Sequence, residues 1–182
     1  MAADYEFHTV WRATGTVAEV RDVLADGPSL PRWWPAVFLS VEMLDEGDGT
    51  GVGAEIAQLT TGWLPYTLRW TLSVAEPVTE TGYALTAAGD LVGDGRWTFR
   101  QDGPQVVITY DWRVSASKPL LRRLTWLLRP LFAANHRWAM ARGEESLRLE
   151  LRRRRATSEA ERRRVPLPPP ATFRRSTRGR GA

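Results

Sequence analysis

The chain has 182 residues, of which 43% are apolar and nine are tryptophan, enough to form the core of one domain. It contains no cysteine, which excludes disulfide bonds, thiolate metal ligands and cysteine nucleophiles. The N-terminus lacks the basic and apolar regions of a signal peptide, and no apolar run approaches the ~20 residues that span a bilayer, so we expect a cytoplasmic protein.

The N-terminal residues predict a strand followed by two short helices. Over residues 5–13 apolar and polar side chains alternate, which is the period of a strand with one solvated face. Thr16 and Glu19 then form a capping-box pattern that starts a helix, and the Gly-Pro pair at 27–28 ends it. A second short helix is expected over residues 29–34.

The middle of the chain predicts only strands and turns. Six successive strands are expected at residues 38–45, 52–60, 65–75, 81–89, 91–101 and 105–115. Gly, Asp and Pro residues separate them, and their succession implies an antiparallel meander. Alternation places Trp97, Tyr110 and Trp112 on one aromatic face, and Arg100 and Asp111 on the opposite, solvated face.

The longest expected element is a helix from Lys118 to about Arg155. Pro130 lies inside it and should kink the helix or divide it in two. One apolar stripe follows the proline at helical spacing, formed by Phe132, His136, Met140, Gly143, Leu147 and Leu151. This stripe has to be buried, and the aromatic face of the sheet is available to cover it. Glycine is unfavourable inside a helix, so Gly143 is expected either to permit a close contact or to border a cavity.

The last residues of the chain are strongly basic. Residues 1–116 hold 7 basic and 16 acidic side chains, whereas residues 117–182 hold 18 basic and 5 acidic ones. Residues 156–182 combine Arg runs with a proline-rich segment, a composition that predicts a disordered tail after a domain over residues 1–155. Such a tail could contact nucleic acid or an anionic membrane weakly by charge attraction, or it could be solvated without a dedicated partner.

Four short sequences carry a resemblance to a known superfamily. They are Trp33-Trp34-Pro35, Gly89-Asp-Leu-Val-Gly93-Asp-Gly95-Arg96-Trp97, Tyr110-Asp-Trp112-Arg113-Val114 and Asn135-His136-Arg-Trp138-Ala-Met140-Ala-Arg-Gly143. With the order of elements over residues 4–155, they resemble the START-like, or SRPBCC, superfamily of polyketide cyclase/dehydrase and lipid-transport proteins, and bacterial polyketide cyclase-like members in particular. The resemblance implies an α+β helix-grip fold, in which a curved antiparallel sheet of about seven strands wraps around a long C-terminal helix. Two short helices follow the first strand in that fold.

The resemblance also implies a ligand cavity between the sheet and the last helix. The candidate ligand-binding residues are Trp11, Trp34, Tyr66, Trp70, Trp97, Tyr110, Trp112, Phe132, Asn135, His136 and Met140. An aromatic surface with few polar groups suits a flat or greasy ligand, because buried apolar area supplies the affinity and a few polar groups set the orientation. Alternatively, these side chains simply fill a core. The two inward-facing glycines, Gly93 and Gly95, would leave space either for a ligand or for close packing.

Few residues offer catalytic chemistry. His136 lies on the apolar stripe and is the candidate general acid or base, with a satisfied core histidine as the alternative. No nucleophile motif, phosphate-binding glycine loop or paired-histidine metal spacing occurs, so neither a cofactor nor a metal is expected. Asp90 and Asp94 are expected to be solvated, and Arg96 to form a surface ion pair.

Three functions are compatible with these patterns. The first is binding, with or without transport, of a small hydrophobic molecule such as a lipid or an aromatic polyketide. The second is a cofactor-independent polyketide cyclase, aromatase or dehydratase that uses His136. The third is association with a membrane or nucleic acid through the basic tail, with a merely structural domain before it.

Overall fold

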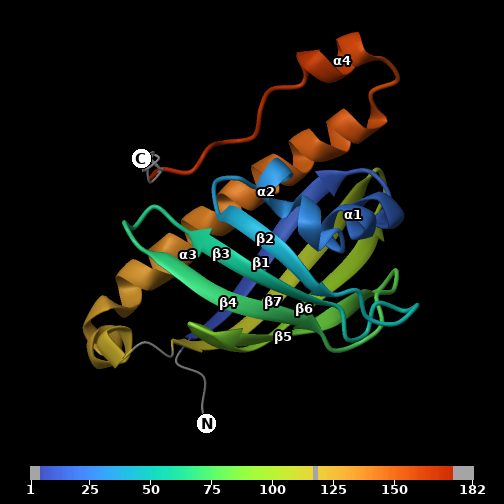
Figure 1. The fold of residues 1–182 in the computed structure, drawn as a ribbon. Helices are drawn as coiled ribbons and strands as arrows, with labels where there is room; N and C mark the ends of the chain where they lie inside the picture. The colour runs from blue at the N-terminus through green and yellow to red at the C-terminus, as the bar shows by residue number, and fades with distance from the viewer. Residues whose placement is uncertain (1–4, 117–118, 174–182) are drawn as a thin grey trace, which may run out of the picture.

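The protein is described here from a computed structural model, which covers residues 5–116 and 119–173, with the backbone alone for 116 and 119–128 (Figure 1). Its strands form a single antiparallel sheet in the order β1-β7-β6-β5-β4-β3-β2. The strands are β1 (Tyr5–Thr14), β2 (Phe38–Asp45), β3 (Glu55–Thr61), β4 (Thr67–Val74), β5 (Gly82–Gly89), β6 (Leu91–Asp102) and β7 (Gln105–Ala116). Strands β2 to β7 follow one another as neighbours, which confirms the predicted meander.

The first strand, β1, lies at one edge of the sheet and pairs with the last strand, β7. In β1, the side chains that the alternation assigned to the core face are more buried than those between them. The pairing with β7 sets Trp11 opposite Ile108 and Phe7 opposite Trp112. Because side chains alternate along both strands, this register places the apolar side chains of β1 and β7 on the same concave face.

Two short helices connect β1 to β2, as predicted. Helix α1 (Val17–Leu24) starts with a capping box, in which Thr16 Oγ1 accepts from the Glu19 backbone N–H at 3.3 Å and the Glu19 carboxylate accepts from the Thr16 N–H at 2.8 Å. These two bonds satisfy amide groups that a helix start leaves unpaired. A 3-10 turn, η1 (Gly27–Ser29), leads into α2 (Leu30–Trp33).

The sheet wraps around the long helix α3 (Pro119–Arg155), so the helix-grip fold is confirmed (Figure 1). Its predicted first residue, Lys118, lies outside the described residues. Of the two effects expected of Pro130, a kink or a division of the helix, the division does not occur, because α3 continues through this residue as one element. A proline removes one backbone hydrogen bond, and here the Phe132 ring, packed at 6.2 Å from Tyr5 and 6.1 Å from Tyr66, anchors the helix just beyond it.

An ion cluster around the buried Glu150 joins α2 to the C-terminal half of α3. Glu150 is only 1% exposed, and Arg32 donates to both of its carboxylate oxygens at 2.8 and 2.9 Å. Arg154 adds a third bond at 2.9 Å. Burial opposes the charged form, yet the hydrogen bonds from the two arginines hold the pKa of Glu150 below its usual value. The cluster therefore holds the C-terminal half of α3 against α2.

A short helix follows in the segment after Arg155. Helix α4 (Glu159–Arg164) starts at Ser158, whose hydroxyl accepts from the Glu161 N–H at 3.1 Å, and its chain continues back toward α3 (Figure 1). The cap and the ion pairs of Glu159 with two arginines one turn away supply local stability that composition does not reveal. Helix α4 buries none of its residues, so it adds nothing to the core.

Within the described part of the chain, no helix is both long and apolar enough to cross a membrane.

Candidate functional site

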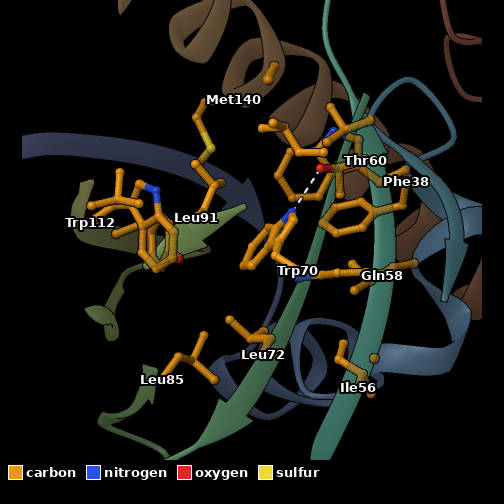
Figure 2. Close-up of a pocket in the computed structure, with 18 of the residues that line it drawn as sticks. Phe38, Ile56, Gln58, Thr60, Trp70, Leu72, Leu85, Leu91, Trp112 and Met140 are labelled. Atoms are coloured by element: carbon orange, nitrogen blue, oxygen red, sulfur yellow. Dashed lines mark hydrogen bonds between the residues drawn. The ribbon is translucent and has the colours of Figure 1, made fainter. Parts of the chain in front are cut away.

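A cavity of about 270 Å³ lies between the concave face of the sheet and α3. All seven strands contribute side chains to its wall, and α2 and α3 close it. Most of the lining is aliphatic or aromatic, as Figure 2 shows for Phe38, Leu72 and Trp112. None of the described lining residues is an Asp, Glu, Lys or Arg. Such a space suits a compact apolar ligand.

The structure brings most of the sequence-predicted residues to this cavity. Those that line it are Trp34, Tyr66, Trp70, Trp97, Tyr110, Trp112, Phe132, Asn135, His136 and Met140. Trp11, which was also predicted there, is not among the lining residues. Its ring is 2% exposed and packs 5.4 Å from both Trp34 and Trp97, so it forms a layer behind them. Strand alternation identifies the face of a side chain, whereas its depth depends on what packs over it.

Aromatic rings form a continuous strip across three strands. Trp97 stacks on Tyr110 at 4.1 Å, and Tyr110 stacks on Trp112 at 5.7 Å. Trp70 lies 5.8 Å from Trp112 and extends the strip to β4. A Cβ atom on Gly95 would lie 2.7 Å from the Tyr110 hydroxyl and from the Trp112 ring. Gly95 therefore makes room for the stacked rings and not for a ligand.

The other glycines noted in the sequence also serve close packing. A Cβ atom on Gly143 would overlap the Trp34 ring and lie 2.7 Å from Trp11 Cη2. Of the two explanations for a glycine at this place in α3, close contact is thus the one that the structure supports. On β6, a Cβ atom on Gly93 would collide with the backbone of β7 at Arg113.

Asn135 is used to hold a loop and does not present a free amide to the cavity. Its Oδ1 accepts from the backbone N–H groups of Trp63 and Leu64 at 2.9 and 3.3 Å, and its Nδ2 donates to the Tyr66 hydroxyl at 3.3 Å. These bonds pin the connection between β3 and β4 onto α3. Burial raises the pKa of Tyr66 to about 12, so its hydroxyl keeps its proton at neutral pH.

His136 lines the cavity next to Asn135. Its ring stacks on Phe7 with 3.9 Å between the ring centres, and its Nε2 has no hydrogen-bond partner among the described residues. Burial, together with the charge of Arg137, lowers the pKa of His136 to about 4. The imidazole is therefore neutral at pH 7 and can exchange a hydrogen bond with a ligand.

Polar residues of the wall that were missed in the sequence include Gln58 and Thr60, both on β3. Gln58 on β3 is 5% exposed, lines the cavity, and neither atom of its amide has a hydrogen-bond partner among the described residues. Its position was available from the alternation, since Gln58 lies between Ile56 and Thr60 on the inward face of the strand. A glutamine at an inward-facing position of a predicted strand is the sequence signal that could have identified this residue.

The charged candidates lie on the outside of the sheet. Arg96 forms the expected surface ion pair, with Glu76. Asp94 is exposed, and Asp90 accepts a hydrogen bond from the Arg69 backbone N–H at 2.8 Å. Over residues 5–116 and 119–173, the structure contains no group of three or more His, Asp or Glu side chains placed to hold a metal ion.

A family model described as polyketide cyclase / dehydrase and lipid transport matches residues 6–151. The chain belongs to this family. The resemblance to the START-like superfamily is thereby confirmed. No curated protein is similar enough in sequence to match the chain.

Solved structures share the fold at low sequence identity. The Zhui aromatase/cyclase from Streptomyces sp. R1128 is 16% identical, with a TM-score of 0.66 over 85% of this chain and 98% of that one. A protein from Thermus thermophilus is 16% identical, with a TM-score of 0.63 over 79% and 97%. A START superfamily protein from Mycobacterium smegmatis is 14% identical, with a TM-score of 0.59 over 78% and 98%. These likenesses concern the fold alone.

Proposed function

We propose that this family member binds a small hydrophobic molecule, such as a lipid or an aromatic polyketide, in the cavity between the sheet and α3. The observation that carries the proposal is the composition of the wall, in which stacked aromatic rings and aliphatic side chains surround the space without a charged side chain among the described residues. Burial of apolar ligand surface supplies about 25 cal/mol of binding free energy per Å², so such a wall favours a hydrophobic ligand.

The cavity volume favours a compact ligand. Its volume of about 270 Å³ lies just below the ~300–1,000 Å³ that is typical of small-molecule sites. A flat molecule of a few rings fits this volume, and its faces would meet the strip formed by Trp97, Tyr110 and Trp112. The tail of a long-chain lipid would have to extend beyond the cavity.

A cofactor-independent cyclase, aromatase or dehydratase is the second candidate, and the unpartnered Nε2 of His136 in the cavity wall is the observation that favours it. A general base is most effective when its pKa lies near the working pH. With a pKa of about 4, His136 is a weak base and carries almost no proton to donate at pH 7. The hydrogen bonds of Asn135 are also committed to the loop. These two facts support binding over catalysis.

The proposal is tested by what the protein retains. The purified full-length chain is incubated with an extract of its host, washed, and examined by native mass spectrometry. We expect a retained hydrophobic molecule, and we expect Ala139→Phe, which fills the cavity from α3, to lose it. Ala141→Phe is the matched control, because Ala141 is exposed on the same helix. An empty wild-type protein, or retention that Ala139→Phe does not change, would contradict the proposal.

His136→Ala separates the two candidates. A binding protein keeps most of its affinity for the retained molecule, because the imidazole supplies only one edge of a large apolar wall. An enzyme keeps binding but loses conversion of the molecule, which mass spectrometry of the incubated mixture detects. Conversion by the wild-type protein that disappears in His136→Ala would replace the binding proposal by the catalytic one.

A further inference from the structure

The side chain of Gln58 is an amide in the cavity wall that the fold itself leaves unused, beside the unpartnered Nε2 of His136 and Nε1 of Trp34. Figure 2 shows it on β3 between Ile56 and Thr60. It is 5% exposed, and both Nε2 and Oε1 lack a hydrogen-bond partner among the described residues. An amide withdrawn from water without partners costs free energy, so its presence calls for a group that pairs with it.

The neighbours of Gln58 already have hydrogen bonds of their own. Trp70, which lies opposite Gln58 in the pairing of β3 with β4, donates its Nε1–H to Thr60 Oγ1 at 2.9 Å, the dashed line in Figure 2. This bond fixes the indole plane and uses one of the two lone pairs of the Thr60 hydroxyl oxygen. The site next to Gln58 is therefore a fixed aromatic surface with a free amide at its side.

The remaining polar groups of the wall carry no charge at neutral pH. Burial raises the pKa of Tyr66, Tyr83 and Tyr110 and lowers that of His136. An ionic group inside the cavity would lose its hydration without meeting an opposite charge among the described lining residues. The wall thus selects against anions and cations. The neutral amide of Gln58, which offers a donor and an acceptor together, and the neutral imidazole of His136 are left to distinguish among neutral ligands.

We propose that Gln58 is the specificity-determining residue of the cavity, and that it pairs with a neutral ligand edge that holds a hydrogen-bond donor and an acceptor side by side. A lactam or a primary carboxamide on a flat ring has such an edge, and the ring would lie against Trp70. The glutamine amide offers one N–H and one C=O in the same plane, so it can form both bonds at once. This inference rests on the proposed function and narrows it to a ligand class.

Three probes that share one bicyclic frame test the inference. 2-Quinolone has adjacent N–H and C=O groups, coumarin replaces the N–H by an ether oxygen, and coumarin-3-carboxylate adds a negative charge. Binding to the full-length chain is measured by isothermal titration calorimetry. We expect 2-quinolone to bind about tenfold more tightly than coumarin, since coumarin leaves the Gln58 carbonyl unpaired, and we expect the anion to bind most weakly.

The variant Gln58→Met has nearly the same shape and no hydrogen-bonding groups. It should reduce the preference for 2-quinolone over coumarin to within twofold, while Leu85→Met, a change elsewhere in the same wall, should leave the preference intact. Gln58→Leu repeats the test should Gln58→Met fold poorly. The unliganded Gln58→Met protein should melt no lower than wild type, because the change removes an unpaired amide.

The outcomes separate this inference from the proposed function. Equal binding of 2-quinolone and coumarin to the wild type, or a preference that survives Gln58→Met, would overturn the role of Gln58 and leave hydrophobic binding intact. Tightest binding of coumarin-3-carboxylate would overturn the neutral-ligand class. No binding of any probe to the wild type would overturn both proposals together.

Discussion

Replacing Gly143 by alanine should destabilise the protein, although the same change stabilises most helices. Alanine gains ~1 kcal/mol over glycine from helix propensity. Here the new methyl group would overlap the Trp34 ring and lie 2.7 Å from Trp11, in a layer where both rings are buried. Overpacking of this kind costs about 1–3 kcal/mol. The expected net loss is about 1 kcal/mol.

Thermal unfolding followed by circular dichroism measures this difference. For a domain of this size, 1 kcal/mol lowers the melting temperature by about 2–4 °C. The control is Ala141→Gly, two residues away on the exposed side of α3, which loses helix propensity and should also lower the melting temperature. A Gly143→Ala protein that melts above wild type would refute the close packing of α3 on the two tryptophans.

Three further predictions concern the loop, the histidine and the tail. Asn135→Ala removes the hydrogen bonds that hold the β3–β4 connection, so the rate of amide hydrogen exchange at Trp63 and Leu64 should rise. An unchanged exchange rate would show that other contacts hold this loop. His136 binds a proton in the unfolded chain near pH 6.5 but in the folded protein only near pH 4, so its contribution to stability is complete above pH 6.5 and is lost as the pH falls toward 4. Titration by NMR should place its midpoint near pH 4, and a midpoint near 6.5 would contradict its burial. Deletion of residues 156–182 should leave the melting temperature within about 2 °C of the wild-type value, because α4 buries no side chain. The deletion should also abolish any sedimentation with anionic vesicles. Vesicle binding by the truncated protein would show that residues 1–155 bind the membrane.

Much of the fold follows from local patterns in the sequence. The alternation in β7 places Tyr110 and Trp112 on the inner face and Asp111 on the outer one, because successive side chains of a strand point to opposite sides. The capping box of Thr16 and Glu19 marks the start of α1 by chemistry that involves only neighbouring residues. Such patterns are complete within a few residues, so they can be recognised without knowing the rest of the molecule.

The candidate site depends on contacts that no local pattern contains. Asn135 accepts its hydrogen bonds from a loop about 70 residues earlier, so its amide looked available in the sequence. Trp11 has the parity of a wall residue, but Trp34 and Trp97 cover it. Gln58 was visible as a polar residue on an inward face, yet its lack of partners emerges only when every neighbouring strand is in place.

The pairing of β1 with β7 has a consequence for how the protein is made. Tyr5 pairs with Val114 and Thr14 with Gln105, so the first strand meets a partner about 90 to 110 residues further along the chain. Contacts of such long range slow folding, because a large loop must close before they form. On the ribosome, β1 waits until β7 has been synthesised, and α3 follows later still. The cavity therefore comes into existence only after α3 has been synthesised, and its ligand can be captured only from that point on.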